Sequence, residues 1–212
     1  QMLTMATAIE GHPDNVAPAM LGGFVTSAYD EGQVYSVKKN ISDDLAFAAF
    51  IPNFKLLTEK ARAALPAQVS HKDAVYNLSR AALATAAFCD GEYELLRVAT
   101  KDKLHQQYRL PLIPGGEEIF ELAHELGAYA VHISGAGPTI MAVVHRDNED
   151  FFAQAEEAMD NIDYYMKCLN AHSLLVSLKI LLDSLWESGE DKSSDAGSIM
   201  QQVEQIHKYI ER

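Results

Sequence analysis

Cysteine and basic residues are scarce in this sequence. Cys89 and Cys168 are the two cysteines among 212 residues, and their wide separation fits no metal-binding spacing. We therefore expect two free thiols in a reducing compartment. Lysine and arginine number 17 against 30 aspartates and glutamates, so the formal net charge is −13. Because nucleic acids and anionic membranes bind basic surfaces, we expect neither as a partner.

A signal peptide and a membrane-spanning run are also absent. An apolar stripe covers 174–185, but Lys179 and Asp183 interrupt it and it is too short to cross a bilayer. Hydrophobic residues make up 48% of the chain, enough for a folded core. The chain starts at Gln1, directly before an expected helix over 2–10, so we expect a fragment of a longer, cytoplasmic protein.

The segment 10–15, with the sequence EGHPDN, concentrates polar side chains. It holds two carboxylates, an imidazole and a carboxamide, with a glycine that frees the backbone and a proline that restricts it. Pro18 suits the first turn of a helix, and Asp14 or Asn15 suits its N-cap. We therefore predict a polar cluster at a helix N-terminus, where an anion or a metal-bound phosphate is stabilised. A capped surface turn is the alternative.

Hydrophobic periodicity and turn residues predict the order of helices and strands. Two short strands form a hairpin around Asp30, and Ser70 caps a long helix with Asp73 in the capping-box position. The expected strands cover 24–29, 34–37, 45–51, 128–133 and 140–145, and the expected helices cover 55–65, 71–88, 93–103, 117–126 and 148–159. This order predicts an α+β fold with most of a ferredoxin-like β-α-β-β-α-β unit. No closing strand is expected after the last helix.

Residues 161–212 have a different pattern. Six leucines between 174 and 185 lie on one helical stripe, and a second apolar helical spacing runs from Ile199 to Ile210 after a polar stretch. We expect a helical hairpin here. Three alternatives remain for this hairpin: it folds back on the main domain, it forms a dimerisation or partner-binding surface, or it has little function of its own. The second alternative predicts a homodimer.

Several separated motifs resemble those of one enzyme family. The segment 10–19 is followed by MLGGF at 20–24, and ISGAGPT occurs at 133–139. Between them stand IPNF at 51–54, VSHKDAVYN at 69–77, and LHQQYR at 104–109 leading into IPG at 113–115. In this order the motifs are similar to those of the homoserine kinases, which belong to the GHMP family of small-molecule kinases. The resemblance covers residues 1 to about 160.

This resemblance implies a fold and an activity. Residues 1–40 are expected to be the end of the family's N-terminal domain, 41–160 its ferredoxin-like C-terminal domain of antiparallel sheet and helices, and 161–212 an added helical tail. The expected reaction is ATP-dependent phosphorylation of L-homoserine to O-phospho-L-homoserine, in threonine biosynthesis. The alternatives are another GHMP kinase with a different alcohol substrate, or a non-catalytic fragment that acts as a helical interaction module.

One part of the family pattern is missing from the sequence. Homoserine kinases carry a glycine- and serine-rich loop whose backbone N–H groups hold the ATP phosphates. No Gly-Leu-Gly-Ser-Ser-type run occurs in these 212 residues. We therefore expect weak or absent kinase activity from this chain alone.

The resemblance also implies roles for single residues. Asn15 and Thr58 are the expected catalytic residues, at the hydroxyl end of the substrate site. Glu10 is the expected Mg²⁺ ligand, because hard cations prefer oxygen. Gly137 is the expected cofactor-site residue, since its turn would support the phosphate loop. The expected substrate-binding residues are His12, Asp14, Arg62, Arg109 and Gly135.

An amino-acid substrate fits these residue types chemically. Its ammonium needs a carboxylate, which Asp14 supplies, and its carboxylate needs the forked guanidinium of Arg62 or Arg109. Thr58 lies one helical turn before Arg62, so both project from one face. His12 is able to act as a base, but we expect it to orient the substrate. The alternatives are that Glu10 is a surface carboxylate, that the two arginines form solvated salt bridges, and that the turn at 135–137 is a plain connection between strands.

Overall fold

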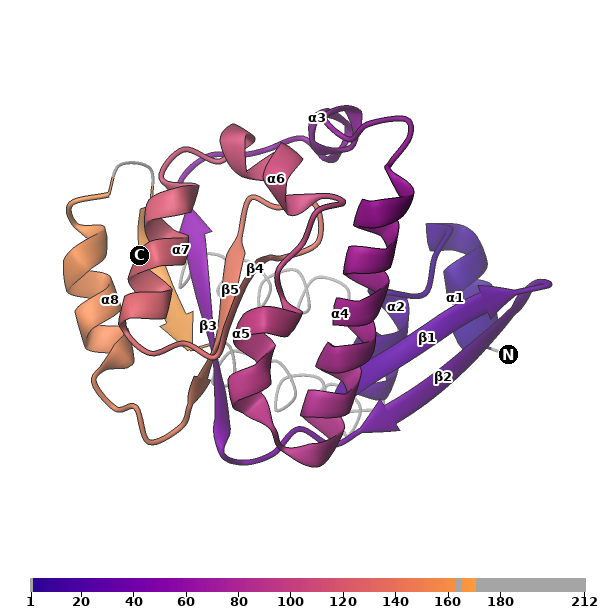
Figure 1. The fold of residues 1–212 in the computed structure, drawn as a ribbon, viewed down its shortest axis with the longest axis horizontal. Helices are drawn as coiled ribbons and strands as arrows, with labels where there is room; N and C mark the ends of the chain where they lie inside the picture. Colours follow the sequence, from indigo (N-terminus) through magenta and orange to yellow (C-terminus); the bar gives the residue numbers. More distant parts are fainter. Residues whose placement is uncertain (1, 163–164, 171–212) are drawn as a thin grey trace, which may run out of the picture. The chain divides into compact units, whose positions relative to one another are not determined.

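A four-stranded antiparallel sheet organises the chain from residue 45 onward (Figure 1). The structure is a computed structural model that describes residues 2–162 and 165–170. The strand order is β4-β5-β3-β6, with β3 (Leu45–Pro52), β4 (Ala130–Ile133), β5 (Ile140–His145) and β6 (Tyr165–Asn170). Helices separate β3 from β4 and β5 from β6, so the chain order is β-α-β-β-α-β. The predicted α+β class and ferredoxin-like unit are confirmed.

One face of this sheet is covered by α7 (Gly116–Glu125) and α8 (Phe151–Met159). Side chains alternate between the two faces of a strand, so every second residue of β3, β4 and β5 faces these helices. The buried residues here include Ala46, Ala48, Phe50, Val131, Ile133, Ile140, Ala142 and Val144 from the strands and Ile119, Ala123, Phe151, Ala155 and Met159 from the helices. Burial of this apolar surface is the main force that stabilises the domain.

The opposite face is covered at one end by α4 (His71–Asp90) and α5 (Leu96–Ala99). Leu45 of β3 and Val143 of β5 face this side and pack with side chains of both helices. The intervening residues of the same strands therefore form a second, smaller core, and the sheet is buried on both faces at this end.

The predicted cap of α4 is confirmed. The Asp73 N–H donates to Ser70 Oγ at 3.0 Å, and Ser70 Oγ donates to Asp73 Oδ2 at 2.6 Å. These bonds satisfy one of the free N–H groups of the first turn and orient the carboxylate near the positive end of the helix. A local sequence signal is therefore enough to fix the start of α4.

The connections between β3 and β4 contain shorter helices than predicted. The helix expected over 55–65 is α3 (Thr58–Ala63), and the helix expected over 93–103 is a 3-10 turn, η1 (Tyr93–Leu95), followed by α5. Beyond α5 the chain forms α6 (Gln106–Arg109) and η2 (Leu110–Leu112), which were not predicted. Asp102 accepts backbone N–H groups of the following segment, so it starts a new element instead of continuing α5.

The N-terminal part of the described chain forms a small sheet of its own. Its elements are α1 (Met2–Glu10), α2 (Val16–Leu21), β1 (Phe24–Asp30) and β2 (Gln33–Lys39). Glu31 and Gly32 turn between the antiparallel strands with φ of 45° and 77°, as a tight hairpin requires. Phe24 stacks on Phe88 of α4, with ring centroids 4.5 Å apart. The predicted first helix and hairpin are confirmed.

The expected absence of a closing strand is wrong. β6 pairs antiparallel with β3 and completes the sheet, and Cys168 is 3% exposed within it. Apolar and polar residues alternate only weakly in the sequence of β6, YMKCLN. Pairing with β3, rather than the local sequence pattern, therefore makes this segment a strand. Residues 165–170 therefore do not start a helical tail. The helical hairpin predicted from the repeats after residue 173 lies outside the described residues.

Candidate active site

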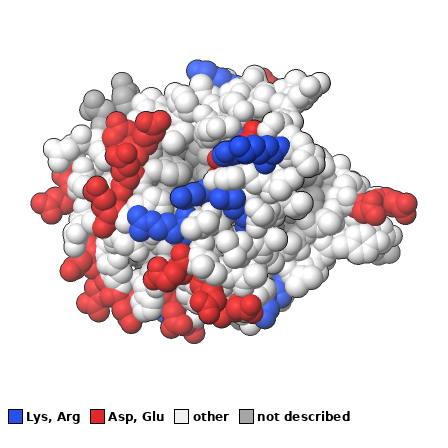
Figure 2. All heavy atoms as spheres, viewed as in Figure 1, with Lys and Arg blue, Asp and Glu red and all other residues white. Residues whose placement is uncertain are grey.

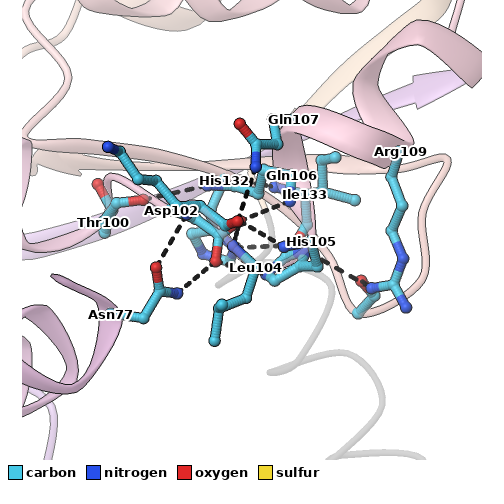
Figure 3. A network of polar contacts seen from close by, with 12 residues as sticks. Asn77, Thr100, Asp102, Leu104, His105, Gln106, Gln107, Arg109, His132 and Ile133 are labelled. Carbon is cyan, nitrogen blue, oxygen red and sulfur yellow. Dashed lines mark hydrogen bonds and ion pairs between the residues drawn. The ribbon is translucent and has the colours of Figure 1, made fainter. Parts of the chain in front are cut away.

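A buried carboxylate, Asp102, fixes the start of α6 (Figure 3). Its Oδ2 accepts the backbone N–H groups of Leu104, His105 and Gln106 at 3.1, 2.7 and 2.6 Å. Its Oδ1 accepts an N–H from the Asn77 side chain of α4 at 2.5 Å. The Asp102 side chain is only 7% exposed. One carboxylate thus joins the first turn of α6 to the long helix α4.

These hydrogen bonds favour the ionised form of Asp102. Burial by itself would raise the pKa of the carboxyl, but the N–H groups of His105 and Gln106, the Asn77 amide and the charge of His105 together lower it. Only the carboxylate accepts at both oxygens, since a protonated oxygen would be a donor. Because a single helical turn is unstable alone, this cap is a condition for α6 to form.

Gln106 ties α6 to the sheet (Figure 3). Its Oε1 accepts the backbone N–H of Ile133 at 2.9 Å, and its Nε2 donates to the Thr100 carbonyl at 3.1 Å. Gln106 is one of the few buried polar side chains, at 8% exposure. Ile133 is the last residue of β4, so this bond places α6 beside the loop that leads from β4 to β5.

The loop between β4 and β5 is the tight glycine turn that the sequence predicts. The Ser134 N–H donates to the Thr139 carbonyl at 2.8 Å, and the Gly137 N–H donates to the Ser134 carbonyl at 2.9 Å. Gly135 and Gly137 have φ of 55° and 86°, a region that favours glycine. A Cβ on Gly137 would lie 3.1 Å from Ile113 Cδ1, a tight contact that the Ile113 side chain would have to relieve by a small shift. The predicted role of Gly137 at the ATP site stays a prediction.

Arg109 connects α6 to two other segments through its guanidinium. Its Nε donates to the Ala61 carbonyl of α3 at 3.3 Å, and its Nη1 donates to the Gly135 carbonyl at 2.9 Å. Nη1 also lies 3.5 Å from His105 Nδ1. Within the described residues no carboxylate pairs with Arg109, so these neutral partners leave its positive charge uncompensated. A guanidinium has five N–H donors, so Nη2 is left for a ligand.

The short helix α3 carries two further predicted residues. Thr58 and Arg62 lie one turn apart and are exposed, whereas Ala61 between them is 0% exposed and accepts from Arg109. Neither Thr58 nor Arg62 makes a side-chain hydrogen bond or ion pair in the part of the chain that is described. α3 thus contacts Arg109 through the Ala61 carbonyl, and the substrate-site roles of Thr58 and Arg62 stay predictions.

Two histidines near Arg109 favour their neutral form. Burial lowers the pKa of His105; the charge of Asp102 opposes this, while Arg109 and His132 lower the pKa further. Burial also lowers the pKa of His132, whose Nδ1 donates to the Ile133 carbonyl at 3.1 Å. Neutral imidazoles do not compete with Arg109 for an anion. The guanidinium therefore remains the positive centre of this group.

The motif 10–15 forms an exposed turn between α1 and α2. His12 Nδ1 pairs with Asp14 Oδ1, which also accepts the Asn15 N–H at 2.8 Å. The side chains of His12 and Asp14 are 40% and 71% exposed. Asn15 stands at the N-cap position of α2, but its side chain makes no capping bond. The predicted side-chain cap is therefore wrong, because Asp14 accepts the N–H of the next residue instead of one in the helix.

Glu10 is the exposed last residue of α1. It makes no side-chain hydrogen bond or ion pair with any other described residue. Residues 2–162 and 165–170 contain no group of three or more His, Cys, Asp or Glu side chains that could hold a metal. Because Mg²⁺ is usually bound by one or two carboxylates with phosphate oxygens and water, Glu10 suits a single ligand but does not make a complete site.

The predicted site residues therefore fall into two groups. The α6 group, around Arg109, contains Thr58, Arg62, Gly135 and Gly137. The turn group contains Glu10, His12, Asp14 and Asn15. Among the described residues, no hydrogen bond or ion pair links the two groups.

Three residues that hold the α6 group were not predicted from the sequence. They are Asn77, Asp102 and Gln106. An aspartate shortly before a helix is a recognised N-cap signal, so Asp102 could have been found if α6 had been expected. The two amides carry no local signal, because their partners lie in other elements of the fold.

On the face shown in Figure 2, acidic side chains gather at the left and lower edges, and a smaller basic group lies near the middle. Burial lowers the pKa of His124; a backbone hydrogen bond with Ala128 opposes this, and the charges of Arg97 and Lys101 lower the pKa further. No helix in the described part of the chain has the length and apolarity to cross a bilayer. The expectation of no nucleic-acid partner stays a prediction.

Comparisons with known proteins give concordant results. Residues 84–165 match the family model described as GHMP kinases C terminal. The chain is 53% identical over 157 residues to a homoserine kinase of Clostridium beijerinckii, covering 74% of this chain and 53% of that protein. A homoserine kinase of Clostridium botulinum (strain Alaska E43) is 43% identical over 167 residues, covering 79% and 54%.

A solved structure gives the same picture. The crystal structure of homoserine kinase from Cytophaga hutchinsonii aligns with a TM-score of 0.66 at 27% identity, over 72% of this chain and 49% of that one. The chain spans about half the length of the curated relatives it matches. The family match runs from the second half of α4 to the start of β6, and so includes α6, Arg109 and the glycine loop.

Proposed function

We propose that this chain belongs to an enzyme that phosphorylates L-homoserine with ATP, because residues 84–165 match the GHMP kinases C terminal family model and the chain is similar to homoserine kinases. The product is O-phospho-L-homoserine, a precursor in threonine biosynthesis, and the proposed location is the cytoplasm. The similarity to two homoserine kinases at 53% and 43% identity supports this substrate over other alcohols.

The observation that carries the proposal is the uncompensated guanidinium of Arg109. Two carbonyl acceptors, from Ala61 and Gly135, fix its direction and leave Nη2 for the substrate carboxylate. Because these donors are oriented before the substrate arrives, binding costs less side-chain entropy. Arg62, exposed on α3, supplies a second guanidinium to the same carboxylate.

The turn group is proposed to bind the other end of the substrate. Asp14 pairs with the ammonium, and His12 and Asn15 orient the hydroxyl together with Thr58. Phosphoryl transfer needs positioning and charge neutralisation more than covalent help from the protein, so hydrogen-bonding groups of this kind are sufficient.

The nucleotide requires two further contributions. Glu10 would give one carboxylate oxygen to the Mg²⁺ that neutralises the phosphates of ATP. Gly137 would support the phosphate-binding part of the site from the turn between β4 and β5. Both roles rest on residue chemistry and on the family resemblance.

Isothermal titration calorimetry of the chain with L-homoserine, and separately with ATP and Mg²⁺, tests the proposal. We expect L-homoserine to bind and Arg109→Ala to lose most of that binding. Arg97→Ala, at an exposed position on α5, is the matched control and should bind as the wild type does. If the wild-type chain binds neither ligand, or if both variants bind L-homoserine equally well, the proposal is wrong.

A further inference from the structure

The backbone of Arg109 lies in a single short helical turn. α6 contains only four residues, Gln106–Arg109, and Arg109 is the last of them. Its backbone N–H donates to the His105 carbonyl at 3.1 Å, which closes that turn. A helix this short does not form without outside help, because nucleation is unfavourable. The direction of the Arg109 side chain therefore depends on whatever holds the first residues of α6.

Asp102 is the group that holds them. Its carboxylate accepts three consecutive backbone N–H groups at the start of α6, so it fixes three peptide units with one side chain. The Asn77 side-chain NH₂ donates to the other oxygen at 2.5 Å, and the side-chain oxygen of Asn77, Oδ1, accepts the Lys103 backbone N–H at 2.9 Å. The cap is therefore attached to the twenty-residue helix α4.

From this arrangement we propose that Asp102, braced by Asn77, is a positioning residue for substrate binding. It does not touch the substrate; it sets the direction in which Arg109 presents its free N–H groups. The inference rests on the proposed function, because it assigns Asp102 to the carboxylate end of the same site. It goes further by giving the buried carboxylate a role in affinity rather than in stability alone.

Asp102→Asn is the sharpest variant because no orientation of the amide suits the site. Both oxygens of Asp102 accept from N–H donors, so the new NH₂ must face either Asn77 or the backbone. Asn77 cannot rotate its own amide without losing the Lys103 N–H. The substitution is nearly isosteric, so it disturbs hydrogen bonding far more than packing.

Asp73→Asn is the matched control. Asp73 is also a capping carboxylate, but it serves α4 through Ser70 and lies 3.7 Å from Lys103. It has no bond to α6 or to Arg109. The control therefore removes one negative charge from the same neighbourhood and keeps the Ser70 cap of α4, without changing Asp102 or its backbone partners.

The first readout is the Arg109 Nε–H signal in a ¹⁵N–¹H spectrum, which needs no ligand. The chain has six arginines, and loss of one signal in Arg109→Lys assigns it. This N–H donates to Ala61, so its exchange with water should be slow in the wild type. We expect several-fold faster exchange in Asp102→Asn and wild-type exchange in Asp73→Asn. Equal exchange in the wild type and Asp102→Asn would overturn the proposal.

The second readout is the affinity for L-homoserine by calorimetry. Asp102→Asn should weaken binding about tenfold while Asp73→Asn binds as the wild type does. Equal weakening by both variants would show a purely structural role. If Asp102→Asn does not fold, Asn77→Ala, which frees the other oxygen, is measured and judged in the same way. If the wild type binds no homoserine, the proposed function fails, while the exchange rates still decide whether Asp102 positions Arg109.

Discussion

Arg109 and Asp14 are proposed to bind opposite ends of one substrate, yet the fold holds them in different ways. Arg109 donates to carbonyls of two other segments, and its helix is capped by a buried carboxylate. Among the described residues, Asp14 makes polar contacts only with His12 and Asn15, its neighbours in sequence, and its side chain is 71% exposed. The α6 group is thus oriented by tertiary contacts, whereas the turn group is oriented locally.

This difference predicts where substitutions act. Residues of the α6 group that hold the helix should affect both stability and binding. Exposed residues, whether on α3 or in the turn, should affect binding with little change in stability. The following variants test this separation, from the largest expected effect to the smallest.

Arg62→Ala should weaken L-homoserine binding by about 1.5–3 kcal/mol if Arg62 makes a charged hydrogen bond to the carboxylate. Arg62 is exposed and unpaired in the described part of the chain, so the substitution should change the unfolding free energy of the protein by less than about 0.5 kcal/mol. Calorimetry and urea denaturation measure the two quantities. An unchanged affinity would remove Arg62 from the site.

Gln106→Leu should lower the unfolding free energy by about 1–3 kcal/mol, because it leaves the buried Ile133 N–H without a partner. Gln107→Leu is the control: the neighbouring side chain is exposed and bonds only locally, to the Lys103 carbonyl. Urea denaturation of both variants gives the comparison. Equal stability of the two variants would show that the tie between α6 and β4 is unimportant.

Stability should fall as the pH drops below about 6.5, the ordinary pKa of histidine. Burial lowers the pKa of His132 in the fold, so below that pH the unfolded chain binds more protons than the native one. One histidine contributes at most about 1.4 kcal/mol per pH unit. His132→Gln should remove the contribution of His132 to the pH dependence of the unfolding free energy, as measured by denaturation at several pH values.

The control for this pH effect is His71→Gln, at an exposed position at the start of α4. It should keep the wild-type pH dependence. If His132→Gln and the wild type lose stability in parallel as the pH falls, His132 is not the group that couples protons to folding.

Asp14→Asn should change the unfolding free energy by less than about 0.5 kcal/mol, since exposed ion pairs contribute little. Denaturation in urea checks this value beside Gln106→Leu. A loss as large as that of Gln106→Leu would mean that the turn group is as firmly held as the α6 group. The contrast between the two regions would then disappear.

Much of the fold could be predicted because its signals are local. The capping pair Ser70 and Asp73, the hairpin at Glu31 and Gly32, and the glycine turn after β4 are each determined by neighbouring residues. β6 was missed because its pairing with β3 outweighs a weak pattern. α6 was missed because its stability comes from Asp102 rather than from helix propensity.

The candidate site follows the same rule. Motifs predict roles for Arg62, Arg109 and Gly135, and in the fold the Arg109 guanidinium bonds to the helix of Arg62 and to the Gly135 carbonyl. Their supporting residues, Asn77 and Gln106, act through partners 25 or more positions away in the chain. Such long-range hydrogen bonds leave no periodic trace in a sequence, so only the structure reveals them.

The most direct test compares L-homoserine with its amide, which lacks the carboxylate charge, in the wild type and in Arg109→Ala. Calorimetry of each protein with each ligand separates the contact between Arg109 and the carboxylate from any general loss of binding. The wild type should prefer L-homoserine over the amide, and Arg109→Ala should bind the two about equally. The same preference for L-homoserine in both proteins would show that Arg109 does not bind the carboxylate.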